Sequence, residues 1–225
     1  MATKIKGIVF DLDGTLIHST IDFPKMKRRM IAILEDNDIP KGMLTHRQTT
    51  VVILARAEEI WRSHGKEEEK IAEIKEALEE TMNRGELEAI STVNEVEGAS
   101  ETLRWLKEKG YKLAILTRSH HPYAVEALQK IRMHQYFDSI LGRGETPRPK
   151  PYAEALRHAS NIMGLKIGEI VFVGDNHIDH ASAVNADCLF IGVRTGPRGD
   201  ASWAENWPEV LLDSVVDLPG YLDSI

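Results

Sequence analysis

The feature that most limits how this chain can fold is a regular alternation of short apolar segments with amphipathic segments of helical period, running from about residue 96 to residue 193. A further apolar segment stands near the start of the chain. Strands that alternate with single helices predict a parallel sheet between two helical layers, the doubly wound α/β class. The expected strands cover residues 5–10, 111–116, 139–141, 170–173 and 188–193, and the expected helices cover residues 98–109, 122–133, 151–163 and about 178–185.

Residues 22 to about 92 interrupt this alternation, because their periodicity is helical and no segment among them has the pattern of a strand. Asp22 is placed to cap the first helix, with Pro24 in its first turn. In the stretch KEEEKIAEIKEALEE the apolar residues recur at spacings of three and four, so we expect the charges to form a solvated face rather than an acidic binding surface. The sequence therefore predicts a core of residues 1–15 and 95–225 and an inserted helical cap of residues 16–94, with helices at about 22–36, 45–64 and 66–83.

The tail that begins at Gly196 carries two tryptophans and a short apolar segment. We expect a final strand near residues 210–212 and a short helix near Leu218, both packed on the core. Trp203 and Trp207 are predicted to be buried anchors of this tail, because large aromatic side chains gain most from removal from water.

Composition restricts the partners and the compartment that we expect. The chain has 225 residues and a formal charge of −7, which argues against nucleic acid as a partner because a phosphate backbone requires a basic face. No apolar run approaches the roughly 20 residues that span a bilayer, and the first residues lack the apolar stretch of a signal peptide. We therefore expect a cytoplasmic monomer or homodimer with no membrane contact. The single cysteine, Cys188, has apolar neighbours and is predicted to be a core thiol rather than a nucleophile.

The first apolar strand runs directly into the segment DLDGT, residues 11–15. Asp11 and Asp13 are two residues apart, so on an extended backbone both side chains leave on the same side, and Gly14 allows a sharp turn above them. Two crowded carboxylates repel each other unless a cation compensates their charge. The pair is therefore either a solvated turn or part of a cation site.

Polar clusters also follow the later strands of the predicted sheet. The carboxyl ends of parallel strands meet at one edge of a sheet, so we expect Asp175 to lie near Asp11 and Asp13. Three carboxylates at one edge favour a hard divalent cation with oxygen ligands, and Mg²⁺ is the metal that we predict. The clusters are TRS at residues 117–119, RPKP at residues 148–151 and GDNHID at residues 174–179.

The same edge is expected to bind phosphate. Lys150 supplies a positive charge, while the hydroxyl and amide of Thr117 and the amide of Arg118 could hold phosphate oxygens. Opposite charges around one small volume predict phosphoryl transfer on a small-molecule phosphate ester.

Taken in order, these clusters resemble the four motifs of the haloacid dehalogenase superfamily, and within it the phosphatases similar to phosphoglycolate phosphatase that carry a small helical cap. The first motif, D-x-D-G-T, stands at residues 11–15, and the second, a threonine that ends a strand, is Thr117. The basic residue of the third is Lys150, and the fourth, G-D-x-x-x-D, contains Asp175 and Asp179. The resemblance covers residues 1–15 and about 95–195 and implies a Rossmann-like core; the insertion matches only in position and helical character.

The resemblance implies a phosphatase that works through an aspartyl-phosphate. Asp11 would be the nucleophile, and Asp13 would be the general acid and base. Mg²⁺ would be bound by the carboxylates of Asp11 and Asp175 and by the backbone carbonyl of Asp13. Asp179 would steady Lys150 or a metal-bound water.

Other members of the superfamily provide the alternatives to this interpretation. Relatives commonly have asparagine after the second-motif threonine, whereas this chain has Arg118, which adds charge near the leaving group and leaves the substrate's polarity open. True dehalogenases lack the second aspartate, so Asp13 argues against carbon–halogen cleavage. A sugar phosphomutase such as β-phosphoglucomutase keeps both aspartates and a similar cap and is the alternative enzyme. A non-catalytic interaction module on the same fold is the alternative from another class.

Histidines near these clusters allow two further interpretations. His177 and His180 could share a helix face and bind zinc, although no other His or Cys cluster stands ready to complete a tetrahedral shell. His120 and His121, directly after the TRS cluster, could contact a substrate, but solvated loop histidines are commoner.

Overall fold

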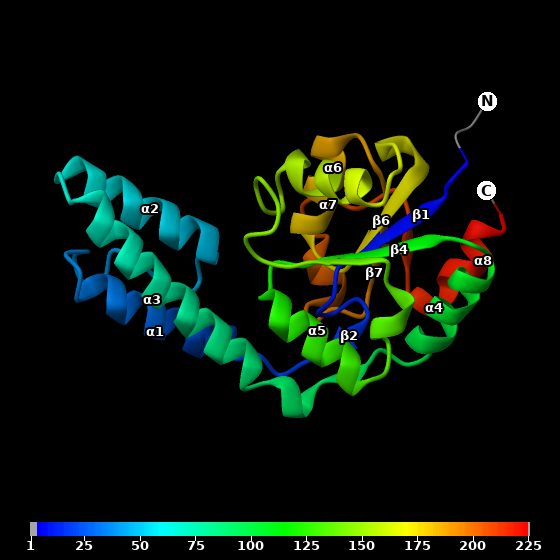
Figure 1. Cartoon of the computed structure of the whole chain (residues 1–225), viewed down its shortest axis with the longest axis horizontal. Coiled ribbons are helices and arrows are strands. Elements are labelled where there is room, and N and C mark those ends of the chain that lie inside the picture. Colours follow the sequence, from blue (N-terminus) through cyan, green and yellow to red (C-terminus); the bar gives the residue numbers. More distant parts are fainter. Residues whose placement is uncertain (1–3, 225) are drawn as a thin grey trace. The chain divides into compact units, whose positions relative to one another are not determined.

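The computed structural model describes residues 4–224, and the chain divides into two compact units (Figure 1). One unit is the segment Thr20–Ala89, and the other joins the chain up to Ser19 with the chain from Ile90 onward. The predicted insertion, residues 16–94, is wider because it includes short strands that belong to the second unit, which we call the core unit. That the helical unit acts as a cap stays a prediction.

The core unit is built on a six-stranded sheet in which every neighbouring pair of strands is parallel. Its strands are β1 (Gly7–Phe10), β4 (Lys112–Leu116), β5 (Ser139–Leu141), β6 (Ile170–Gly174), β7 (Leu189–Val193) and β8 (Leu211–Leu212). The order β5-β4-β1-β6-β7-β8 places β1 inside the sheet. Phe10, its last residue, pairs with Ile115 of β4 and with Val173 of β6, so these three strands end at the same edge.

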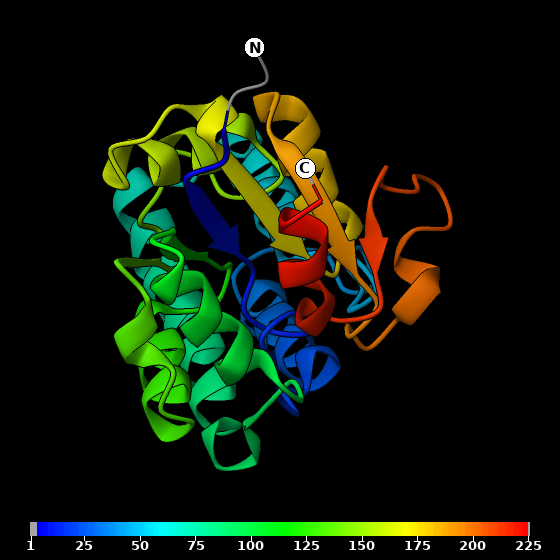
Figure 2. The ribbon, with the colours of Figure 1, turned by 90° about the vertical axis from the view of Figure 1, so that its right-hand side faces the viewer.

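Helices cover both faces of this sheet. The main ones are α4 (Ala99–Glu108), α5 (His121–Lys130), α6 (Ala153–Ile162) and α7 (His177–Ala186). Helices α6 and α7 pack together on one face, and α4 and α5 lie on the other (Figures 1 and 2). Every residue of β1 and β6 is buried, as expected for strands covered on both sides. The predicted doubly wound α/β fold is confirmed.

A second, two-stranded sheet lies where the chain leaves and re-enters the core unit. It pairs β2 (Ile17–His18) antiparallel to β3 (Asn94–Glu95), directly after the 3₁₀ turn η1 (Ile90–Thr92). The sequence did not predict this sheet, because two residues are too few to show a period of two.

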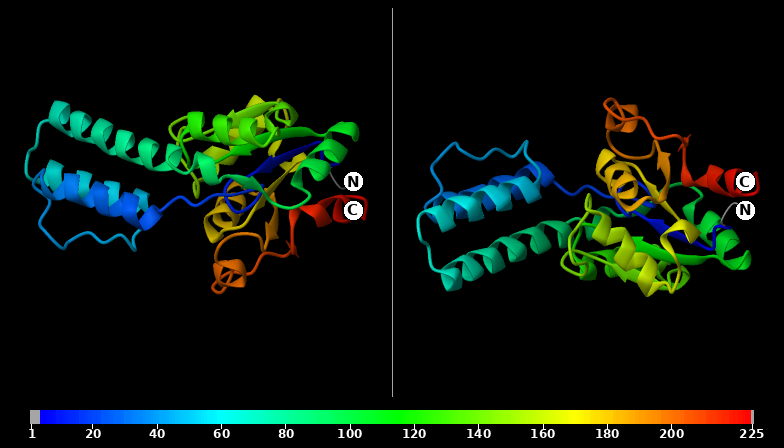
Figure 3. Two further views of the ribbon diagram at one scale, coloured as in Figure 1. Left: turned by 90° about the horizontal axis from the view of Figure 1, so that it is seen from below. Right: turned by 90° about the horizontal axis from the view of Figure 1, so that it is seen from above.

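The helical unit consists of α1 (Phe23–Glu35), α2 (Thr50–Ser63) and α3 (Glu68–Leu87), which lie alongside one another (Figure 3). The Asp22 side chain accepts a hydrogen bond from the amide of Lys25, so the predicted cap of the first helix is confirmed. Trp61 is buried among the apolar side chains of all three helices and donates its indole hydrogen to the carbonyl of Asn37 at 2.6 Å.

The acidic face of α3 is solvated, as predicted. None of the helices in the described part of the chain is both long and apolar enough to cross a bilayer.

Two helix ends differ from the prediction. Helix α2 begins at Thr50 rather than at residue 45, because the Thr49 side chain caps it by accepting a hydrogen bond from the amide of Val52. Helix α3 continues through Gly85 to Leu87, whereas the prediction ended it at residue 83. This glycine lies against Met26: a Cβ at its position would be 3.3 Å from the Met26 Cγ, so its lack of a side chain provides room for packing.

The tail returns to the sheet as β8 and ends in α8 (Leu218–Leu222), as predicted. Trp203 is fully buried and packs against Phe190, with ring centroids 6.0 Å apart, which confirms it as an anchor. The same prediction for Trp207 is wrong, because this side chain is 56% exposed. Its neighbour Pro208 is buried against the sheet instead. The Pro208 ring lies so close to Gly192 of β7 that a Cβ added to this glycine would be 2.9 Å from it.

Candidate active site

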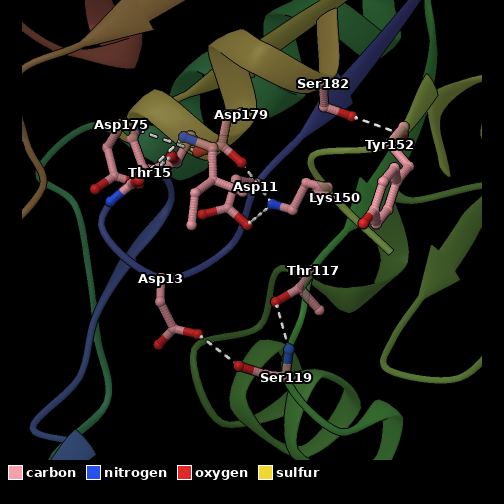
Figure 4. A network of polar contacts seen from close by, with 12 residues as sticks. Asp11, Asp13, Thr15, Thr117, Ser119, Lys150, Tyr152, Asp175, Asp179 and Ser182 are labelled. Carbon is pink, nitrogen blue, oxygen red and sulfur yellow. Dashed lines mark hydrogen bonds and ion pairs between the residues drawn. The ribbon is translucent and has the colours of Figure 1, made fainter. Parts of the chain in front are cut away.

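Buried polar side chains gather at the carboxyl-terminal edge of the sheet (Figure 4). Asp11 follows β1, Thr117 follows β4 and Asp175 follows β6, while Asp179 lies in the first turn of α7 and Lys150 precedes α6. All five residues are at most 8% exposed. The parallel topology therefore brings together side chains that are far apart in the sequence.

Lys150 links two of these carboxylates. Its Nζ donates hydrogen bonds to Oδ1 of Asp11 and to Oδ1 of Asp179, each at 2.6 Å. Burial disfavours the charged ammonium, but the two carboxylates outweigh burial and raise the pKa of Lys150 above its ordinary value. Of the two contacts considered for Asp179, the structure shows the one with Lys150. A fixed positive charge thus lies beside Asp11.

Asp11, Asp175 and Asp179 form a crowded acidic group. Each offers a carboxylate oxygen, and these oxygens lie within 4.8 Å of one another. Burial raises the pKa of Asp175 to about 9, and the charges of Asp11 and Asp179 add to this rise. Burial is also the main cause that raises the pKa of Asp179 to about 6. Within residues 4–224 this is the one group of three or more metal-ligating side chains. Such a group suits a hard cation with oxygen ligands.

The loop after β7 closes around Asp175. A Cβ on Gly196 would lie 1.9 Å from Oδ2 of Asp175, and a Cβ on Gly14 would lie 2.7 Å from the same oxygen. The hydroxyl of Thr195 donates to the carbonyl of Gly14 at 2.6 Å, and that of Thr15 donates to Oδ1 of Asp175 at 3.3 Å. Thr195 and Gly196 were not predicted, because neither stands in a recognisable motif.

The carboxylate of Asp13 lies outside the acidic group and is held by three hydroxyls. Ser19 and Tyr123 donate to Oδ1 at 2.6 and 2.7 Å, and Ser119 donates to Oδ2 at 3.3 Å. Burial raises the pKa of Asp13 to about 6, against the effect of the three donors, and the nearby charge of Asp11 adds to the rise. Ser119 was part of the TRS cluster, whereas Ser19 and Tyr123 had no signal in the sequence.

Thr117 and Arg118 follow β4. The amide of Thr117 donates to the carbonyl of Leu141 at 2.9 Å, so the predicted use of this amide for phosphate is wrong, and the Thr117 hydroxyl is its remaining donor. The Thr117 Oγ1 accepts a hydrogen bond from the amide of Ser119 at 3.1 Å, and the carbonyl of Arg118 accepts one from Arg143 at 3.1 Å. Burial lowers the pKa of Arg118, while the charges of Asp179 and Asp11 act in the opposite direction. The guanidinium of Arg118 is therefore within electrostatic range of the acidic group.

The histidines take no comparable place. His177 and His180 lie on α7, and burial is the main cause that lowers the pKa of each. No third metal-ligating side chain of the described chain joins them, so the zinc hypothesis gains no support. His121 lies 2.8 Å from a carboxylate oxygen of Glu145, and His120 stands at the N-cap of α5. Substrate contact by His120 and His121 stays a prediction.

Cys188 is a poor nucleophile, as predicted. Its thiol lies 3.4 Å from the carbonyl oxygen of Leu189. Burial raises the pKa of the thiol to about 12, so the reactive thiolate is scarce at neutral pH.

The fold and the site together define an α/β protein with a cluster of buried carboxylates at the strand ends. Residues 8–193 match the sequence profile of the haloacid dehalogenase-like hydrolases. Because the match covers most of the chain, the protein belongs to this family, and the resemblance inferred from the motifs is confirmed.

Individual relatives are similar over most of their length. The chain is 29% identical to a phosphoglycolate phosphatase of Pseudomonas fluorescens, over 96% of this chain and 80% of that protein. It is 28% identical to a phosphoglycolate phosphatase of Haemophilus influenzae, over 97% of this chain and 98% of the other. The fold is similar to that of a crystal structure described as a predicted phosphoglycolate phosphatase from Haemophilus somnus, with a TM-score of 0.65. The two sequences are 24% identical, and the match covers 98% of this chain and 99% of that one. A hydrolase from Pseudomonas syringae gives a TM-score of 0.68 at 20% identity, with 98% and 99% coverage.

Proposed function

We propose that this protein is a Mg²⁺-dependent phosphatase that hydrolyses a small phosphomonoester, with Asp11 as the nucleophile. The observation that carries the proposal is the pair of 2.6 Å hydrogen bonds from Lys150 to Asp11 and Asp179, beside Asp175, in a haloacid dehalogenase-like hydrolase. The names of the similar proteins make phosphoglycolate the first substrate to test. We also propose that the helical unit Thr20–Ala89 serves as the cap.

The residues present fit a magnesium ion. The cluster holds three buried carboxylates and one ammonium group, which contacts two of them, so negative charge is in excess, and all the available side-chain metal ligands are oxygens. The carboxylates of Asp11 and Asp175 and the backbone carbonyl of Asp13 would hold the ion. When bound, it supplies positive charge that offsets the repulsion between carboxylate and phosphate.

The first half of the reaction uses Asp11 and Asp13. An Asp11 carboxylate oxygen attacks phosphorus, the bond from phosphorus to the ester oxygen breaks, and Asp13 gives its proton to the departing alcohol. Lys150 fixes the orientation of Asp11 and adds positive charge, and the hydroxyl of Thr117 with the amide of Arg118 bind the phosphoryl oxygens. The product is a free alcohol and a phosphorylated Asp11.

The second half regenerates the enzyme. Asp13, now ionised, takes a proton from a water molecule as that water attacks phosphorus. The bond from phosphorus to the Asp11 oxygen breaks, inorganic phosphate leaves, and Asp13 is again protonated. One carboxyl group thus serves as acid and then as base.

The test is phosphate release from a panel of esters: phosphoglycolate, an aryl phosphate and sugar phosphates. We expect release that requires Mg²⁺, stops with EDTA and falls at least about a thousandfold in Asp11→Asn, because the nucleophile is lost. Asp223→Asn, which removes an exposed carboxylate at the end of α8, serves as the matched control and should leave the rate unchanged.

Two outcomes would contradict the proposal. Interconversion of a sugar phosphate in the presence of a bisphosphate, much faster than any phosphate release, would identify a phosphomutase. Absence of phosphate release from every ester, in wild type as in Asp11→Asn, would identify a non-catalytic module.

A further inference from the structure

We propose that Tyr123 is a positioning residue for Asp13 and that, with Ser119, it fixes the carboxylate of Asp13 in the orientation required for proton transfer. The inference rests on the proposed role of Asp13 as general acid and base. Tyr123 acts through Asp13 and does not itself contact the substrate.

The geometry around Asp13 is the first support. Tyr123 is fully buried in the first turn of α5, and its hydroxyl donates to Oδ1 of Asp13 at 2.7 Å. Ser119, also buried, donates to Oδ2 at 3.3 Å, as the dashed line in Figure 4 shows. Ser19 donates to Oδ1 from the segment after β2. Three hydroxyls, one after β2 and two from the loop and first helical turn that follow β4, thus converge on one carboxylate.

The distribution of these donors over both oxygens is the second support. The torsion that rotates an aspartate carboxylate is broad and has little preference of its own. Donors on one oxygen alone would leave this rotation partly free, whereas donors on Oδ1 and Oδ2 together fix the plane of the group. A buried phenol needs a hydrogen-bond partner, but any carbonyl would satisfy it. Here the partner is the carboxylate beside the nucleophile.

A fixed carboxylate matters most when the leaving group is a strong base. An alkoxide leaves phosphorus only if it is protonated as the bond breaks, whereas a nitrophenolate leaves without such help. Loss of the Tyr123 hydroxyl should therefore lower kcat/KM for alkyl esters more than for aryl esters, because kcat/KM reports only the steps up to departure of the alcohol. A merely structural role would lower kcat/KM for both classes equally.

The experiment compares wild type with Tyr123→Phe, and with the double variant Ser19→Ala/Tyr123→Phe that removes both donors to Oδ1, on an alkyl ester, glycerol phosphate or phosphoglycolate, and on p-nitrophenyl phosphate. We expect kcat/KM for the alkyl ester to fall about ten- to a hundredfold in Tyr123→Phe, the range set by one hydrogen bond to a charged group, and to fall further in the double variant. For the aryl ester we expect kcat/KM to fall by less than about threefold. Tyr111→Phe, which removes a hydroxyl just before β4 at the opposite edge of the sheet, is the matched control and should change neither rate.

An equal fall for both esters, or no fall for either, would overturn the positioning role. Should Tyr123→Phe fail to fold, Ser119→Ala decides by the same comparison, because it removes the donor to the other oxygen. A wild-type enzyme that releases phosphate from no ester would overturn the proposed function itself, and this inference with it.

Discussion

Gly196 illustrates how one residue without a side chain can decide the position of a site carboxylate. Its Cα approaches Asp175 so closely that an added Cβ would lie 1.9 Å from Oδ2, and its backbone is not in the left-handed region, so the constraint is purely steric. We predict that Gly196→Ala displaces Asp175 and lowers kcat at least about tenfold, because a small misplacement at a reacting centre has large effects. Phosphate release at saturating substrate, measured across Mg²⁺ concentrations, checks this prediction.

The control for Gly196→Ala is Gly168→Ala. No atom lies within 4 Å of the position where the Gly168 Cβ would stand, so this variant tests the exchange of glycine for alanine without a clash. Wild-type activity in Gly196→Ala would mean that the β7 loop moves aside easily and does not define the place of Asp175.

The candidate site was predictable where its residues stand in ordered motifs. The motifs pointed to Asp11, Lys150 and Asp179, and the structure brings the three together through the contacts of Lys150. Tyr123 and Gly196 were not predictable, because a lone tyrosine in a helix and a lone glycine in a loop have no local pattern. Their relation to the site comes from tertiary contacts across the sheet edge, which one sequence does not encode locally.

At the scale of elements, periodicity predicted the type of every long segment and failed only at ends and at very short pieces. The strands of the large sheet are continuous apolar runs, which is why they were found. The start of α2 was set by the capping side chain of Thr49, and α3 continues through Gly85, which packs on Met26. Both effects depend on side-chain geometry that a count of apolar residues does not contain.

Asp138, just before β5, connects three elements and gives a prediction about pH. Its carboxylate accepts hydrogen bonds from the amide of Leu113 in β4 at 2.8 Å and from Lys107 in α4 at 2.9 Å. Burial alone would raise its pKa, but the Leu113 amide and Lys107 outweigh burial and lower the pKa below its ordinary value. Asp138→Asn keeps an acceptor oxygen and removes the charge. We expect it to reduce the free energy of unfolding at pH 7 by roughly 0.5–1 kcal/mol, a small effect because the side chain is 44% exposed.

The sign of the pH dependence follows from the lowered pKa. A carboxylate with a lower pKa in the folded state stabilises the fold above its unfolded pKa of about 3.9, and this contribution disappears as the pH falls through the folded value. The difference between wild type and Asp138→Asn should therefore be largest at pH 7 and vanish toward pH 3, as urea unfolding would measure. A difference that stayed constant with pH would show that the charge of Asp138 is unimportant.

At the scale of the whole molecule, each of the two units has its own apolar core. In the helical unit, Met30, Leu34 and Leu78 belong to one buried cluster, and in the core unit the strands and α6 contribute to another. A unit that buries its own apolar surface can fold by itself. The composition of the chain did not reveal this division, but the change from alternating strands and helices to helices alone did.

This independence predicts that the core unit folds without the insertion. In the antiparallel pair of β2 and β3, His18 lies opposite Asn94, so the two ends left by removal of residues 20–89 are close enough for a short Gly/Ser linker. We expect the shortened chain to show the circular dichroism of an α/β protein and one cooperative unfolding transition in urea. The full-length protein with the same linker inserted after the exposed Lys41 controls for the linker itself. A shortened chain that unfolds without cooperativity, while this control unfolds normally, would show that the core unit depends on the helical unit for its fold.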